Sequence, residues 1–176
     1  EYMGEKEREE FLSRFSEVGT DNLRLTEMAP SKEVAELRKN KGEETADRRS
    51  LLGFCVLGGI FSEGIDLKND SLIGAMIVGT GLPQISQEKE ILKGYFDDKG
   101  EDGFGYAYRY PGMNKVLQAA GRVIRTVEDV GIVALLDERF LQPSYRRLFP
   151  REWEEYETVT VNTVAKRVER FWNEWL

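Results

Sequence analysis

The residues at 113–126, MNKVLQAAGRVIRT, and the run VGIVALL at 130–136 decide the fold. In the first stretch, apolar residues recur at helical spacing on one side and polar residues occupy the other, which predicts a helix. The second stretch is a continuous apolar run, typical of a strand that is buried on both faces of a parallel sheet. Two similar runs precede the helix, at 51–57 and 72–78. Because parallel strands require a crossover connection, the sequence predicts a doubly wound α/β fold.

The outer parts of the chain carry weaker signals. Residues 5–15 predict a helix with an acidic first turn, and residues 20–50, poor in large apolar side chains, predict a charged insertion. Near the C-terminus, residues 162–176 place their large apolar side chains on one helical face, which predicts a helix docked on the core. We expect one domain over 1–176. The apolar face of the C-terminal helix comprises Val164, Val168, Phe171, Trp172 and Trp175.

Composition excludes several classes of protein. The 176 residues contain no histidine, which excludes serine–histidine hydrolases, cysteine–histidine proteases and most zinc enzymes. Cys55 is the single cysteine; its apolar surroundings predict a buried core thiol in a protein of the reducing cytoplasm. No apolar run approaches the roughly 18 residues that span a bilayer, so no membrane partner is expected. The net charge of −7 means that any contact with nucleic acid must be a local patch.

The segment at 58–66, GGIFSEGID, is the first place where chemistry is concentrated. It follows the predicted first strand, and ligands of open α/β sheets bind at the carboxyl ends of strands. Its glycines, Gly64 among them, permit close approach of the backbone, and Ser62, Glu63 and Asp66 add a hydroxyl and two carboxylates. The segment lacks the P-loop pattern, and a plain structural turn explains it equally well.

The helix predicted at 113–126 is the second and stronger place. Gln118, Arg122 and Arg125 fall on one face at offsets of four and seven, and Gly121 leaves room for close approach. The two arginines repel each other and no acid shares their stripe, while planar guanidinium groups suit phosphate oxygens. A salt bridge to carboxylates elsewhere in the fold is the alternative. The opposite, apolar face comprises Val116, Ala120, Val123, Ile124 and Val127.

Arginines and aromatic residues alternate after the third predicted strand. Arg139, Arg146 and Arg147 lead this cluster, with aromatic side chains between and after them. Arginines along a backbone with stacking aromatics are typical of single-stranded nucleic-acid binding, but a basic helix packed on an acidic body fits equally. The acidic stretch at 97–103 lacks the ligand pattern of a calcium loop and predicts a solvated loop.

Taken together, these segments resemble a known family. GGIFSEGIDL (58–67) resembles motif V, and QAAGRVIR (118–125) resembles motif VI, of superfamily-two helicases of the XPD/DinG type, bacterial DinG-like helicases above all. The strands with their flanking GTGLP (79–83) and LLDERF (135–140) are similar as well. The resemblance implies a RecA-like parallel sheet flanked by helices, forming an incomplete second motor domain of an ATP-dependent DNA helicase.

The resemblance also implies residue roles. Arg122 and Arg125 would be arginine fingers organised by Gln118, and Glu63, Gly64, Asp66 and Gly121 would line the nucleotide. Contacts to DNA are expected separately, from the arginine and aromatic cluster at Arg139, Arg146 and Arg147 and from Ser62 in the turn at 58–66.

Other parts of such an enzyme have no counterpart in the sequence. ATP and Mg²⁺ would be bound mainly by a first motor domain, because the chain has no P-loop and no acidic Mg²⁺ motif. Any iron–sulfur cluster is likewise expected only outside this chain. We therefore predict a fragment that is inactive alone, whose partners are single-stranded or forked DNA and the first RecA-like domain. Two other classes stay open: a noncatalytic nucleotide or protein interaction domain, and a nucleotide-sugar transferase lobe.

Overall fold

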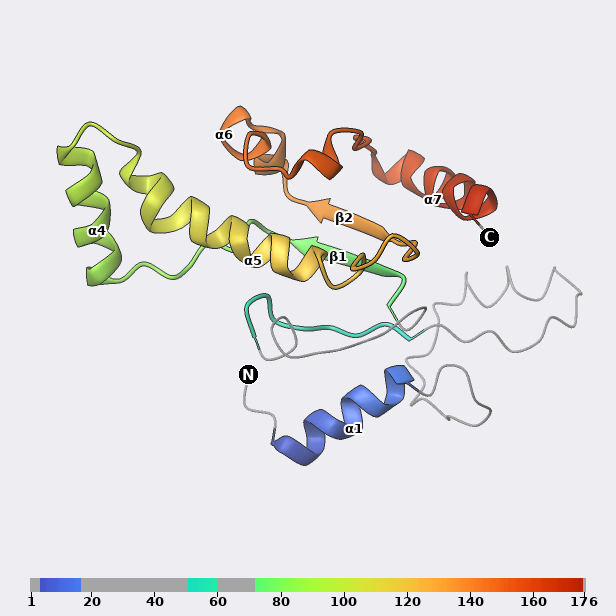
Figure 1. Cartoon of the computed structure of the whole chain (residues 1–176). Helices are drawn as coiled ribbons and strands as arrows, with labels where there is room; N and C mark the ends of the chain where they lie inside the picture. Colours follow the sequence, from blue (N-terminus) through green and yellow to red (C-terminus); the bar gives the residue numbers. More distant parts are fainter. Residues whose placement is uncertain (1–3, 17–50, 60–71, 176) are drawn as a thin grey trace, which may run out of the picture. The chain divides into compact units, whose positions relative to one another are not determined.

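The computed structural model describes residues 4–16, 51–59 and 72–175, which fall into two units that divide after Cys55. The first unit contains α1 (Glu5–Ser16), a helix with acidic residues in its first turn and an Arg14–Glu10 salt bridge of 2.9 Å. This confirms the predicted N-terminal helix. The second unit carries the sheet and all other helices of the described part (Figure 1).

A parallel pair of strands lies at the centre of the second unit. β1 (Gly74–Val78) pairs with β2 (Ile132–Leu136), and the register places Gly74 opposite Ile132 and Val78 opposite Leu136 (Figure 1). Side chains alternate across the sheet, so Ile77 points into the core while Met76 and Val78 are exposed. The parallel pairing predicted from the two apolar runs is confirmed.

Three helical segments form the crossover between the strands. α4 (Gln87–Asp98) begins at Ser86, whose hydroxyl accepts a hydrogen bond from the Lys89 amide at 3.4 Å. It packs against a π-helical turn, η2 (Gly105–Arg109), which continues directly into α5 (Tyr110–Ala120). Figure 1 shows α4 extending well beyond the ends of the strands, whereas α5 runs back along the sheet.

The chain after β2 closes the core. It forms η3 (Glu138–Leu141), α6 (Pro143–Arg146) and η4 (Arg151–Trp153), and then α7 (Val161–Trp175). The centre of the core is a cluster contributed by β1, α5, η3 and α6. Its buried members are Ile77, Met113, Val116, Ala120, Phe140 and Tyr145.

The strand predicted at 51–57 is wrong. These residues have no strand geometry, and their apolar side chains are largely exposed, with Phe54 at 82%. A strand is held by ladder hydrogen bonds, and in the described part of the chain β1 and β2 pair only with each other. The buried thiol was also a wrong prediction, because Cys55 is exposed.

The helix predicted at 113–126 begins earlier and ends at Ala120. Gly121 follows as the C-cap, and the next residues are rich in β-branched side chains, which disfavour helix. The Asp129 carboxylate then accepts the amides of Arg125 (2.8 Å) and Thr126 (2.7 Å), so these donors are satisfied outside a helix. Val123 is still buried as predicted, but Ile124 is exposed and Val127 is fully so at 103%.

The predictions for the C-terminal helix and for the insertion at 20–50 have different outcomes. The C-terminal helix is present as α7, but no residue of it is buried among the described residues, so its docking stays a prediction. The predicted insertion at 20–50 lies outside the described residues. Among the residues that are described, no helix is both long and apolar enough to cross a membrane.

Candidate functional site

Glycine turns gather at the carboxyl end of β1. Gly79 and Gly81, in the turn after the strand, have φ of 83° and 65°, which glycine adopts at little energetic cost. The start of α5 lies against this turn with no side chain between. A Cβ added to Gly81 would lie 2.7 Å from the Gly112 carbonyl, and one added to Gly112 would lie 2.6 Å from the Thr80 carbonyl. The end of the strand and the first turn of the helix are therefore in direct backbone contact.

The described start of the glycine-rich segment joins the same place. Gly58 has φ of 79°, and the Lys115 side chain of α5 lies over it, with Cδ 3.0 Å from where a Cβ would be. Leu57 packs against Gly81 and the core. The structure thus brings the turn at 57–59 beside α5, although no strand precedes it among the described residues. The remainder of that segment, with Ser62, Glu63, Gly64 and Asp66, lies outside the described residues.

Three of the four predicted residues of the arginine motif lie beyond or at the end of α5. Gln118 is exposed on the last turn of the helix, and Gly121 ends it with φ of −66°, an ordinary helical value. Arg122 is half-buried in the following turn, and Arg125 is exposed in the loop. The single helical stripe predicted for these side chains is therefore wrong.

The two arginines are also not isolated charges. Arg122 and Arg125 each interact with further residues of the chain. The repulsion expected between two bare guanidinium groups therefore does not by itself point to an anion. The salt-bridge alternative from the sequence stays open.

Arg139 forms a fork with a neighbouring carboxylate. The Asp137 carboxylate caps η3 by accepting the Arg139 amide at 2.9 Å, and it also accepts Arg139 Nε at 2.9 Å and Nη2 at 2.6 Å. The hydrogen bonds from Arg139 hold the pKa of the Asp137 carboxyl below its usual value. A phosphate would have to compete with this pair for the guanidinium.

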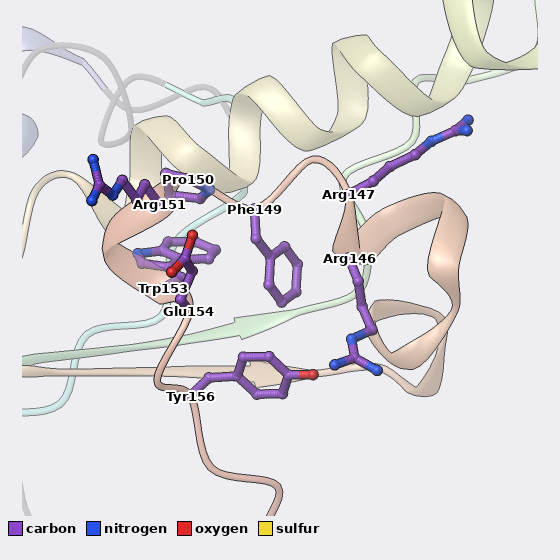
Figure 2. A pocket seen from close by; sticks show the side chains of 8 residues that line it. All are labelled: Arg146, Arg147, Phe149, Pro150, Arg151, Trp153, Glu154 and Tyr156. Carbon is purple, nitrogen blue, oxygen red and sulfur yellow. The ribbon is translucent and has the colours of Figure 1, made fainter.

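Arg146 and Arg147 lie at an open pocket of about 430 Å³ formed after α6 (Figure 2). Phe149 meets Trp153 edge to face at 5.4 Å between centroids, and meets Tyr156 at 5.7 Å. The Arg146 guanidinium lies 5.3 Å from the centroid of the Tyr156 ring. The pocket combines cations with aromatic rings, as the sequence predicted for this stretch. Its lining is completed by Arg147, Pro150, Arg151 and Glu154.

Sequence reasoning missed an ion-pair cluster around Asp102. This carboxylate accepts Arg109 Nη1 at 2.6 Å, the Gly105 amide at 2.8 Å and Arg147 Nη2 at 3.4 Å. Arg109 is largely buried between the rings of Phe104 and Tyr145. A purely solvated loop at 97–103 was therefore a wrong prediction, and the burial of Arg109 that reveals the cluster is visible only in the structure.

The electrostatics of this cluster favour the charged form of the acid. Partial burial acts to raise the pKa of the Asp102 carboxyl, but the Gly105 amide and the guanidinium groups of Arg109 and Arg147 outweigh burial and hold that pKa below its usual value. Asp102 is thus a structural anion that links the crossover to α6. Within the described ranges, no group of three or more acidic, cysteine or histidine residues could hold a metal ion.

Comparison with known proteins agrees with this geometry. Residues 2–156 match the helicase C-terminal domain family, so the chain belongs to that family and has its RecA-like α/β fold. A probable ATP-dependent helicase of Methanocaldococcus jannaschii is 26% identical over 147 residues, which cover 77% of this chain and 23% of that protein. The XPD helicase subunit of general transcription and DNA repair factor IIH from Dictyostelium discoideum is 26% identical, over 81% of this chain and 19% of its own length.

A third relative is bacterial. The ATP-dependent DNA helicase DinG of Photobacterium profundum is 35% identical over 89 residues, which cover 49% of this chain and 13% of that protein. The XPD/DinG resemblance noted from the motifs is therefore confirmed. The chain spans less than a quarter of the length of each of these relatives.

Proposed function

We propose that this domain is the second motor domain of a cytoplasmic ATP-dependent DNA helicase and supplies arginine fingers to ATP hydrolysis. The observation that carries the proposal is the convergence of the turn at 57–59, the end of β1 and α5. In open α/β sheets this end of the strands is where ligands bind. Here it presents glycine backbone at Gly58 and the amine of Lys115, one helical turn before Gln118, while Arg122 follows the opposite end of α5.

The fit of this surface to ATP is that of a partner rather than of a complete binding site. Lys115 on α5, together with Arg122 and Arg125 in the segment after it, supplies positive charge for the phosphates, but the described residues contain no acidic cluster for Mg²⁺. Binding of the triphosphate and of Mg²⁺ is therefore assigned to the first RecA-like domain. When bound, ATP supplies the γ-phosphoryl group whose transfer releases free energy.

In this mechanism the residues of the chain stabilise the negative charge of the phosphates. The guanidinium groups of Arg122 and Arg125 approach the γ-phosphate oxygens and stabilise the charge that develops there. Gln118 orients this pair, and Gly121 leaves space for the nucleotide. The carboxylates of Glu63 and Asp66, with the backbone of Gly64, connect the nucleotide to the DNA.

The DNA track of the proposal runs over Ser62, Arg139, Arg146 and Arg147. Exposed Arg146 and Arg147 beside aromatic rings support it best, because cations and rings together hold single strands without regard to sequence. Arg139 supports it less, since its guanidinium already pairs with Asp137. Single-stranded or forked DNA is the proposed substrate.

The test of the proposed function is the finger substitution in the complete enzyme. Arg122→Ala and Arg125→Ala should each lower the kcat for DNA-stimulated ATP hydrolysis at least about 100-fold, the low side of finger effects. Arg170→Ala, on α7 and outside both proposed sites, is the matched control and should keep ATPase turnover. The circular dichroism spectrum should not change, since α5 ends before both fingers. Normal turnover in both finger variants would instead favour the noncatalytic interaction domain.

A further inference from the structure

We infer that the pocket between α6 and Tyr156 is a stacking site for one nucleobase of a single strand, with its guanidinium groups on the flanking phosphates. This inference rests on the DNA track of the proposed function and adds to it a base-binding element. A pocket of about 430 Å³ falls within the range of small-ligand sites. A base is planar and apolar on its faces, so it is bound most strongly by an aromatic ring that is held in place.

The aromatic wall of this pocket is anchored in the core. Phe149 packs at 6.4 Å from Phe140, which is buried in the central cluster. Phe149 in turn stands edge-on to both Trp153 and Tyr156. Because Phe149 fixes their positions from behind, the outer rings need little reordering when a base arrives. Less ordering on binding leaves more of the interaction free energy as affinity.

Tyr156 is the ring best placed to take the base. It is 39% exposed, and Figure 2 shows its ring at the edge of the pocket with the Arg146 guanidinium beside it. A planar cation on an aromatic ring occupies the place that a planar base would occupy. Stacking of a base on Tyr156 would displace Arg146, whose guanidinium then lies within reach of the neighbouring phosphate.

The charges at the rim fit a nucleotide better than a phosphopeptide. Arg151 forms no ion pair within the described residues and is available to phosphates, and Arg147, although it pairs with Asp102 at 3.4 Å, keeps 58% of its side chain exposed. Glu154 also lines the pocket, and its carboxylate repels a phosphate but accepts a hydrogen bond from the exocyclic amine of a base. A site for a phosphorylated side chain would concentrate arginines and would not need three aromatic rings.

The experiment compares a normal strand with an abasic one. The 176-residue chain is titrated at low ionic strength with fluorescently labelled oligodeoxycytidine and with an abasic strand of equal length, and binding is followed by anisotropy. The normal strand should bind roughly 5- to 150-fold more tightly, the range expected for one stacked base. Tyr156→Ala should remove most of this difference and leave the affinity for the abasic strand unchanged. Tyr156→Phe, which keeps the ring, should behave as the wild type.

The control is Tyr95→Ala, which removes an exposed tyrosine on α4 and should change neither affinity. Equal binding of Tyr156→Ala and wild type to both strands would overturn the stacking site. The DNA track would survive that result if Arg146→Ala with Arg147→Ala still weakened both strands and lowered the salt dependence. Failure of the wild-type chain to bind either strand would overturn both. Displacement of DNA by a phosphotyrosine peptide at equal concentration would assign the pocket to proteins and overturn the inference.

Discussion

The helices α5 and α7 both carry a marked apolar side, yet their surroundings differ. α5 buries Met113 at 1% exposure and Val116 completely, in contact with both the sheet and the segment after β2. α7 has no buried residue among those described, and Trp175 on its apolar face is 60% exposed. The helical period of the sequence is enough to predict either helix. That period does not reveal which surface covers the apolar side of each helix.

The largest expected effect tests this contrast directly. Met113→Ala should lower the free energy of unfolding by about 2–5 kcal/mol, because it leaves a cavity in the core. Trp175→Ala, the matched change on α7, should stay within about 0.5 kcal/mol, as for other surface substitutions. Urea titrations followed by circular dichroism measure both. A comparable loss in the two variants would mean that α7 is covered after all.

The second prediction concerns the Asp102 cluster and its dependence on pH. Because the folded-state pKa of Asp102 lies below the unfolded value, its contribution to stability is present above a pH of about 4 and is lost as the pH falls through the folded pKa. Asp102→Asn should therefore cost roughly 1–2 kcal/mol at pH 7, discounted because the carboxyl is partly exposed. At pH 3 the difference from wild type should shrink.

Thermal or urea unfolding at the two pH values measures this. A difference that is the same at pH 3 and pH 7 would assign the loss to altered packing around Arg109 instead of to the carboxylate charge.

The smallest effect is expected at the base of α7. Glu157 pairs with Arg167 and with Arg170, both at 3.3 Å, and all three side chains are about half exposed. Glu157→Gln should change the unfolding free energy by at most about 1 kcal/mol, and less at high salt, since exposed pairs are screened. The free energy of unfolding of both proteins is measured at about 20 mM and about 500 mM salt. A larger, salt-independent loss would reveal that Glu157 holds α7 against a surface.

The sequence was sufficient for the local elements of the second unit. Continuous apolar runs predicted β1 and β2, and their parallel pairing followed from the helical connection between them. The strand at 51–57 failed because an apolar run fits a strand only when a partner strand pairs with it, which a local pattern does not report. The helix at 113–126 was predicted too long because the helical period of the sequence continues past Gly121. Beyond that residue, low helix propensity and the hydrogen bond from the Arg125 amide to the Asp129 carboxylate end the helix.

The same distinction applies to the candidate site. The position of Gln118 on α5 and the grouping of Arg146 with aromatic rings came from short-range spacing. The cluster of Asp102 with Arg147 joins residues 45 positions apart, so its members could be identified only after the chain had been folded. Arg139 appeared free in the sequence because the fork with Asp137 depends on the turn that η3 makes.

The contact of Gly112 with the peptide at Thr80 and Gly81 has a mechanical consequence. Side chains between two elements can change rotamer and absorb a small displacement, but here backbone meets backbone. A shift of the strand end must therefore move the first turn of α5 by a similar distance, and Lys115 with it. The junction therefore couples the end of β1 rigidly to the start of α5. Neither Gly81 nor Gly112 leaves room for a larger residue.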